Sequence, residues 1–191
     1  MRWLYAVTAL DSVVLLALDV WPGALGLALL CPFFCCATFP LLWGAGAVWF
    51  SLVVRAVARR PEGARRWGRG VKVCVGWMAV CVCLVLLDAP RAAALRIHRD
   101  QFAALAATAP AGYGGAPLGR WVGIFYVTEY GADGRGGVYF VTIQHPDGIG
   151  PDTMSYGFAV RPSRGNCPFG MSAYTQSWLF GDWYSFSVSN D

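Results

Sequence analysis

The chain has 191 residues, of which 57% are hydrophobic and 14% charged, and its formal net charge is +4. The hydrophobic share exceeds that of ordinary soluble domains, so the composition favours a membrane anchor joined to one small domain. The sequence contains no phosphate-binding loop, zinc motif, dinucleotide fingerprint or serine elbow, which excludes the enzyme classes that those motifs define.

The first stretch, residues 3–54, contains no Lys or Arg. It is too long for one membrane span and long enough for two, and Trp21-Pro22-Gly23 is the natural break because Pro and Gly interrupt helices. We therefore predict spans over residues 3–20 and 33–54. Trp3, Tyr5 and Trp21 bracket the first span, as aromatic residues do at membrane interfaces.

Asp11 is the ionisable residue predicted near the middle of a span. Intramembrane acids are costly and often mark ion or proton paths, so a small transporter or channel component centred on Asp11 is one alternative. The other is a bundle-facing acid that is protonated or bonded to Thr8, Ser12 or Ser51. The same acid, with the lack of an Ala-x-Ala site, disfavours a signal peptide.

The loop at 55–70 and the first residues after it carry a local net charge of +6, with seven basic residues and one acid. Such loops stay cytoplasmic, so the next apolar segment, 71–87, is predicted to run outward as a third span. This places the N-terminus inside and the C-terminal part outside the plasma (inner) membrane. The charges are expected to be solvated or to contact lipid head groups, and no pattern for nucleic acid accompanies them. The basic residues are Arg55, Arg59, Arg60, Arg65, Arg66, Arg69 and Lys72.

Six of the seven cysteines lie in the predicted membrane region, where Cys usually acts as a small buried hydrophobe. They are Cys31, Cys35, Cys36, Cys74, Cys81 and Cys83. Only Cys167 lies in the external part, so no disulfide can form within that part. It must fold on its apolar core, or dimerise through the thiol.

After the third span, the spacing of Leu95, His98, Phe102 and Leu105 predicts an amphipathic helix or stalk over 88–110. This helix could lie on the membrane, pack on the next domain or act as a spacer. Gly and Pro then predict a linker over 111–118. Residues 119–191 read as a small antiparallel β domain of five strands, over 120–130, 138–144, 153–161, 172–180 and 183–189.

One pattern in this β domain could carry catalysis. His145 and Asp147, with Asp152, precede Cys167, and a thiol beside an imidazole that an acid orients is the minimum for nucleophilic catalysis. The Ser163-Arg164-Gly165-Asn166-Cys167 stretch resembles the catalytic Ser-His-Gly-Cys run of L,D-transpeptidases, which implies a cell-envelope enzyme. It departs from that pattern at Arg164, at the inserted Asn166 and at Pro168.

The acidic loop residues Asp133, Asp147 and Asp152 fit ordinary turns better than a calcium loop. We therefore expect no metal and no cofactor. The sequence predicts a three-span α-helical membrane anchor that displays a small antiparallel β domain outside, in a binding, structural or assembly role. Its expected partners are the lipid bilayer, another envelope protein or a second copy of the chain. The alternatives are the Cys167 and His145 enzyme and the Asp11 transporter.

Overall fold

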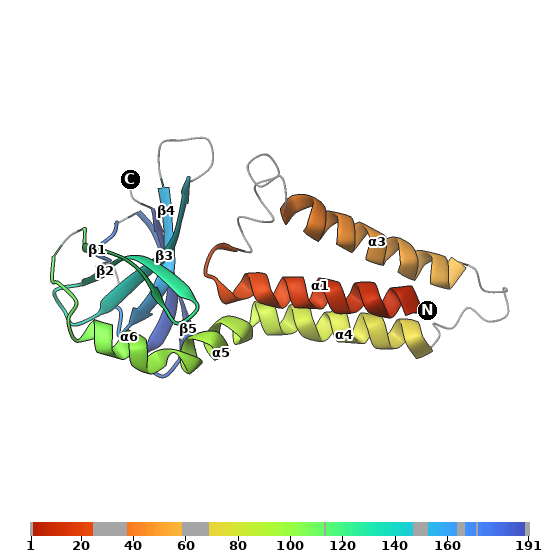
Figure 1. The fold of residues 1–191 in the computed structure, drawn as a ribbon, viewed down its shortest axis with the longest axis horizontal. Coiled ribbons are helices and arrows are strands. Elements are labelled where there is room, and N and C mark those ends of the chain that lie inside the picture. Colours follow the sequence, from red (N-terminus) through yellow and green to blue (C-terminus); the bar gives the residue numbers. More distant parts are fainter. Residues whose placement is uncertain are drawn as a thin grey trace. The chain divides into compact units, whose positions relative to one another are not determined.

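The computed structural model describes residues 2–24, 38–58, 69–112, 114–146, 153–163, 167–170 and 172–189. These residues form five helices and six strands (Figure 1). The chain divides into two compact units, which we describe separately. The helical unit contains Met1–Asp19 and Leu25–Pro90, and the β unit contains Val20–Ala24 and Arg91–Asp191.

Polar side chains on one helix connect the three helices of the helical unit, which are α1 (Arg2–Val20), α3 (Thr38–Ala58) and α4 (Arg69–Leu86). The Thr8 and Ser12 hydroxyls each donate to the backbone carbonyl four residues earlier. They also accept hydrogen bonds from the indoles of Trp49 in α3 (2.8 Å) and Trp77 in α4 (3.1 Å). In an apolar solvent such bonds hold helices together because the groups find no water.

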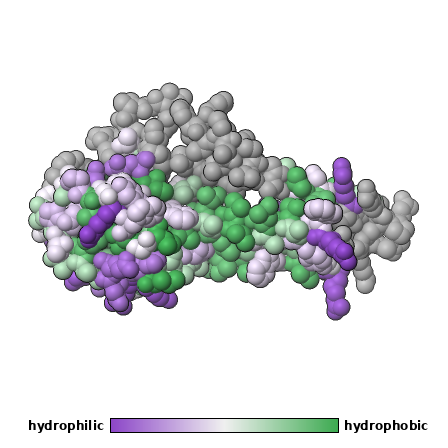
Figure 2. All heavy atoms as spheres, viewed as in Figure 1, coloured by the Kyte–Doolittle hydropathy of each residue, from purple (hydrophilic) through white to green (hydrophobic). Residues whose placement is uncertain are grey.

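Two helices of this unit, α1 and α4, are long and apolar enough to cross a membrane. Only 22% of the apolar window of α1 and 17% of that of α4 are buried, whereas the core helix of a soluble protein would be mostly buried. Figure 2 shows apolar side chains spread over the surface of these helices. The predicted second span, 33–54, is not established, because 33–37 lie outside the described residues and the described apolar part of α3 is Gly46–Arg55.

Two short helices follow α4 where the sequence predicts one amphipathic helix. They are α5 (Ala89–Ile97) and α6 (Arg99–Ala106), and His98 lies between them with backbone angles outside the helical range (φ −103°, ψ 9°). The predicted apolar face packs on the β sheet, since Leu95, Phe102 and Leu105 are all buried in its core. Of the three placements considered for this segment, packing on the β domain is the one observed.

All strands of the sheet are antiparallel, in the order β1-β2-β3-β4-β6-β5. The first four follow one another as a meander, and the β5–β6 hairpin then joins the sheet through β6. Their bounds are β1 Ala116–Val122, β2 Phe125–Ala132, β3 Val138–Pro146, β4 Thr153–Val160, β5 Ser172–Phe180 and β6 Trp183–Ser189.

The prediction of five strands is wrong at one place. The stretch predicted as a single strand over 120–130 is a hairpin, in which β1 and β2 meet at a turn through Gly123 and Ile124. Gly123 has φ +62°, a conformation that glycine adopts without the steric cost of a side chain. Strand β1 also begins at Ala116, inside the segment predicted as a linker.

Apolar side chains cover both faces of the sheet. The larger cluster, here the helix-side core, joins α5 and α6 to residues such as Phe125, Phe140 and Phe158. The smaller cluster, here the loop-side core, lies on the opposite face and consists of Tyr139, Val141, Ala159, Cys167, Phe169, Phe186 and Val188. The neighbours Phe158 and Ala159 belong to different clusters because side chains alternate along a strand. The sheet is therefore a middle layer between two helices and the segment with Cys167.

Candidate functional site

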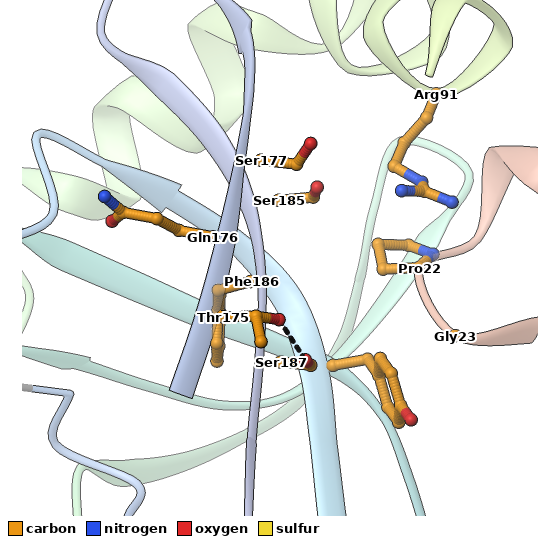
Figure 3. A pocket seen from close by; sticks show the side chains of 10 residues that line it. Pro22, Gly23, Arg91, Thr175, Gln176, Ser177, Ser185, Phe186 and Ser187 are labelled. Atoms are coloured by element: carbon orange, nitrogen blue, oxygen red, sulfur yellow. Dashed lines mark hydrogen bonds between the residues drawn. The ribbon is translucent and has the colours of Figure 1, made fainter. Parts of the chain in front are cut away.

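A cleft of about 360 Å³ with both polar and apolar lining atoms lies in the β unit (Figure 3). It is formed by the β5–β6 hairpin, by Tyr156 of β4, by the first residues of α5 and by the short segment after α1. We call it the hydroxyl cleft. It is lined by Pro22, Gly23, Arg91, Tyr156, Thr175, Gln176, Ser177, Ser185, Phe186 and Ser187.

Four hydroxyls form the floor of this cleft as two cross-strand pairs. Thr175 lies opposite Ser187 and Ser177 opposite Ser185, so all four side chains share one face of the hairpin. The Thr175 and Ser187 hydroxyls are 2.6 Å apart and hydrogen-bonded. This is the face that carries Trp183 into the helix-side core, so it changes from apolar to polar along the strands.

The wall opposite the floor comes from the segment just after α1. Trp21 packs on the helix-side core, and its indole N–H donates to the backbone carbonyl of Ile124 at 3.4 Å. Gly23 has φ +80°, and a Cβ at this position would come within 2.5 Å of the Tyr156 ring. The close approach of the backbone to this ring therefore requires glycine.

Arg91, in the first turns of α5, supplies the charge of the cleft. Figure 3 shows its side chain on the same side as Pro22, across from Ser177 and Ser185. A guanidinium is always protonated and carries five N–H donors. The cleft therefore combines hydroxyls with a guanidinium, and both kinds of group bind hydroxyl groups and anionic oxygens.

Cys167, the candidate nucleophile, is buried in the loop-side core. The pKa of its thiol is raised to about 11, chiefly by burial. A hydrogen bond with the Phe169 backbone lowers this pKa, and the charge of Asp133 makes a smaller contribution that raises it. A thiol in this environment is protonated at neutral pH, whereas a catalytic Cys is activated by a lowered pKa.

The other members of the predicted catalytic set are only partly described. His145 lies in β3, and its backbone pairs with Met154. Its side chain and Asp147 and Asp152 lie outside the described residues, as do Arg164 and Asn166. The Cys167 and His145 enzyme therefore stays a prediction, and the state of the thiol gives it no support.

Asp133 lies in the β2–β3 turn, as the sequence predicts, and its carboxylate stabilises the fold there. Its buried carboxylate accepts hydrogen bonds from the backbone N–H groups of Arg135 (3.0 Å), Gly137 (2.8 Å) and Ser163 (3.1 Å). The Ser163 and Tyr139 hydroxyls also donate to it. Burial opposes ionisation, but these hydrogen bonds outweigh it and lower the pKa of the carboxyl group. Asp133 thus ties the β2–β3 turn to the segment after β4.

The residues predicted to set membrane topology belong to the helical unit. Arg55, Arg69 and Lys72 are exposed, and Arg59, Arg60, Arg65 and Arg66 lie outside the described residues. The Thr8 and Ser12 hydroxyls donate to backbone carbonyls four residues earlier in α1. The expectation that Asp11 is protonated or bonded to Thr8, Ser12 or Ser51 stays a prediction. Asp11 Oδ2 accepts no hydrogen bond from the described residues.

Comparisons with protein families, with curated proteins and with solved structures find no match to this chain.

Sequence reasoning did not find the hydroxyl cleft. The sequence signal for it is the alternation of Ser185, Ser187 and Ser189 in the last strand, which indicates one polar face. It does not reveal that Pro22 and Arg91, far away in the sequence, lie opposite that face.

The Asp133 carboxylate predicts a pH-dependent contribution to stability. We expect Asp133→Asn to lower the free energy of unfolding by about 2 kcal/mol at pH 7, since it removes charge-assisted bonds in a buried site. The folded pKa is lowered, so this contribution is complete above the unfolded pKa of about 3.9 and is lost as the pH falls through the folded value. Urea unfolding of the full chain in neutral detergent, followed between pH 3 and 7, measures the difference. A difference that stayed constant over this range would contradict the assignment.

The raised pKa of the Cys167 thiol predicts that this residue reacts slowly with alkylating reagents. In the folded chain in detergent, we expect alkylation of Cys167, followed by peptide mass spectrometry, to be far slower than that of a cysteine introduced by Arg135→Cys in the exposed β2–β3 turn. The rate should keep rising towards pH 11, because only the thiolate reacts. A rate that levelled off below about pH 7 would instead mark an activated nucleophile and support the enzyme alternative.

Proposed function

We propose that this chain is a multi-pass membrane protein of the bacterial cell envelope, which holds its β unit outside the plasma membrane as a binding module. The hydroxyl cleft is the proposed ligand site and is the observation that carries the binding role. The membrane assignment is supported by the mostly exposed apolar surfaces of α1 and α4 and by the tryptophan hydrogen bonds to Thr8 and Ser12.

The proposed topology has three spans, with α3 as the second. Helix α3 has 21 residues, which corresponds to roughly 31 Å, about the thickness of a hydrocarbon core. The basic residues cluster between the second and third spans, and loops of this kind stay on the cytoplasmic side. An odd number of spans from a cytoplasmic N-terminus then leaves the β unit outside.

The proposed ligand is a glycerol phosphate group. A guanidinium has donors for more than one partner, so Arg91 can donate to the phosphate beside its contact within the chain. The hydroxyls of the ligand match those of Thr175, Ser177, Ser185 and Ser187. The chemistry is available from two sources, the head group of an anionic phospholipid or a soluble polyol phosphate of the envelope. Phospholipid head groups lie close to the cleft in the proposed topology, because two cleft residues follow the predicted spans closely. Pro22 follows the last residue of α1 by two positions, and Arg91 follows the last residue of α4 by five.

The topology predicts opposite accessibility for two arginine positions. We expect Arg135→Cys, in the exposed β2–β3 turn, to react with a membrane-impermeant maleimide in intact cells. Arg55→Cys, at the end of α3, should react only after the cells are permeabilised. Labelling of the unmodified chain gives the background from the native cysteines. The reverse pattern would show that the β unit is cytoplasmic.

The cleft predicts that glycerol phosphate stabilises the folded chain. At about ten times its Kd, a ligand that binds only the folded state adds about 1.4 kcal/mol, which thermal unfolding of the full chain in neutral detergent detects as a higher midpoint. We expect Arg91→Gln to weaken binding about tenfold or more, and Ser177→Ala to weaken it roughly fivefold, from the usual values of charged and neutral hydrogen bonds.

The matched control for this measurement is Arg135→Gln, which removes the same charge from an exposed turn and should leave the midpoint shift unchanged. The source of the ligand is tested in nanodiscs. If the lipid supplies it, phosphatidylglycerol raises the midpoint relative to phosphatidylcholine, and soluble glycerol phosphate then adds nothing. If glycerol phosphate raised the unfolding midpoint equally in Arg91→Gln, Ser177→Ala and the unmodified chain, the assignment of the cleft would be overturned.

A further inference from the structure

The β1–β2 hairpin exposes apolar and aromatic side chains next to the segment that leaves α1. Trp121 is 66% exposed, and Ile124 and Tyr126 are each 41% exposed. Trp121 and Tyr126 are cross-strand partners, and their rings meet edge to face with centroids 5.4 Å apart. We call these three residues the hairpin tip. Their neighbours Val122 and Phe125 point the other way, into the helix-side core.

The hairpin tip is held in place by two contacts within the β unit. The indole of Trp21 donates to the carbonyl of Ile124 in the turn. The ring of His98 lies against Gly123, where a Cβ would clash with it, and packs edge to face on Phe125 at 6.2 Å. The exposed side chains therefore belong to a fixed turn whose position relative to Trp21 is set by a hydrogen bond.

The position of Trp21 in the sequence, directly after α1, relates it to the membrane. Trp21 is the first residue after α1, which ends at Val20. If α1 crosses the bilayer, Trp21 lies at its outer interface, where tryptophan is enriched at the level of the head groups. The turn that accepts its hydrogen bond must then lie at the same level. Trp and Tyr side chains are stabilised at this depth, because the apolar part of the ring contacts the acyl chains and its N–H or O–H group reaches the polar head groups.

We infer that the hairpin tip, Trp121, Ile124 and Tyr126, docks into the outer interface of the lipid bilayer. This inference rests on the proposed membrane topology and goes beyond it, because a β unit outside the cell need not touch the lipid. Docking fixes the orientation of the β unit on the membrane. Ile97 of α5 is 78% exposed and directly precedes His98, whose ring lies against Gly123 of this turn.

The test uses the full chain labelled with 5-fluorotryptophan in vesicles of phosphatidylcholine and phosphatidylglycerol. Fluorine NMR resonances are assigned with Trp121→Phe and with Trp178→Phe. Trp178 is the matched control, since it is 62% exposed and lies in β5, the opposite edge strand of the sheet. Broadening by nitroxide-labelled lipid reports contact with the bilayer, and broadening by a water-soluble gadolinium chelate reports contact with water.

We expect the nitroxide lipid to broaden Trp121 several-fold more than Trp178, and the chelate to do the opposite. Equal response of both residues to the chelate, with no effect of the nitroxide lipid on Trp121, would overturn the docking of the hairpin. Trp77 of α4 separates this outcome from failure of the proposed topology. It is 54% exposed, so it responds to the nitroxide lipid if α4 spans the bilayer, whether or not the hairpin docks.

Discussion

The packing of Phe102 against the sheet is the interaction on which the rest of the β unit depends. This ring is fully buried in α6 and meets Phe125, Phe140, Phe158 and Trp183 edge to face, with centroids between 5.1 and 6.2 Å apart. It therefore joins one helix to four strands. Because α5 precedes α6 directly, the same packing places the start of α5, and so Arg91, relative to the β5–β6 hairpin.

The hydroxyl cleft is possible because the helices cover only part of one sheet face. Where α5 and α6 lie on the hairpin, the strands carry Leu179, Phe180 and Trp183. Where the helices end, the same face carries Ser and Thr, and the segment from Trp21 to Gly23 replaces the helix as the opposing wall. Polar side chains at a buried or half-buried face are stable when they bond to one another, as Thr175 and Ser187 do.

Local patterns in the sequence predicted elements better than they predicted the site. Period-two alternation located β4 and β6, and helical spacing identified the buried Leu95, Phe102 and Leu105, since both signals are set by neighbouring residues. The hairpin at Gly123 was missed because β-branched and aromatic residues flank the glycine on both sides. The hydroxyl cleft was missed for a different reason: Pro22, Arg91 and the β5–β6 hairpin lie far apart in the sequence, and no local rule reports such long-range contacts.

Two stretches of the β unit are joined directly to the helical unit: Val20–Ala24 at both of its ends, and the stretch that begins at Arg91. Under the proposed topology both leave the membrane on the same side, and a domain held at two points has less rotational freedom than one on a single tether. The hairpin tip and the hydroxyl cleft each include or contact the first of these stretches, through Trp21 and through Pro22 and Gly23. Under the proposed topology, both surfaces are therefore linked by noncovalent contacts to the stretch of chain that leaves the membrane after α1. The energy of a weak head-group contact then need not cover the full cost of bringing the domain to the membrane.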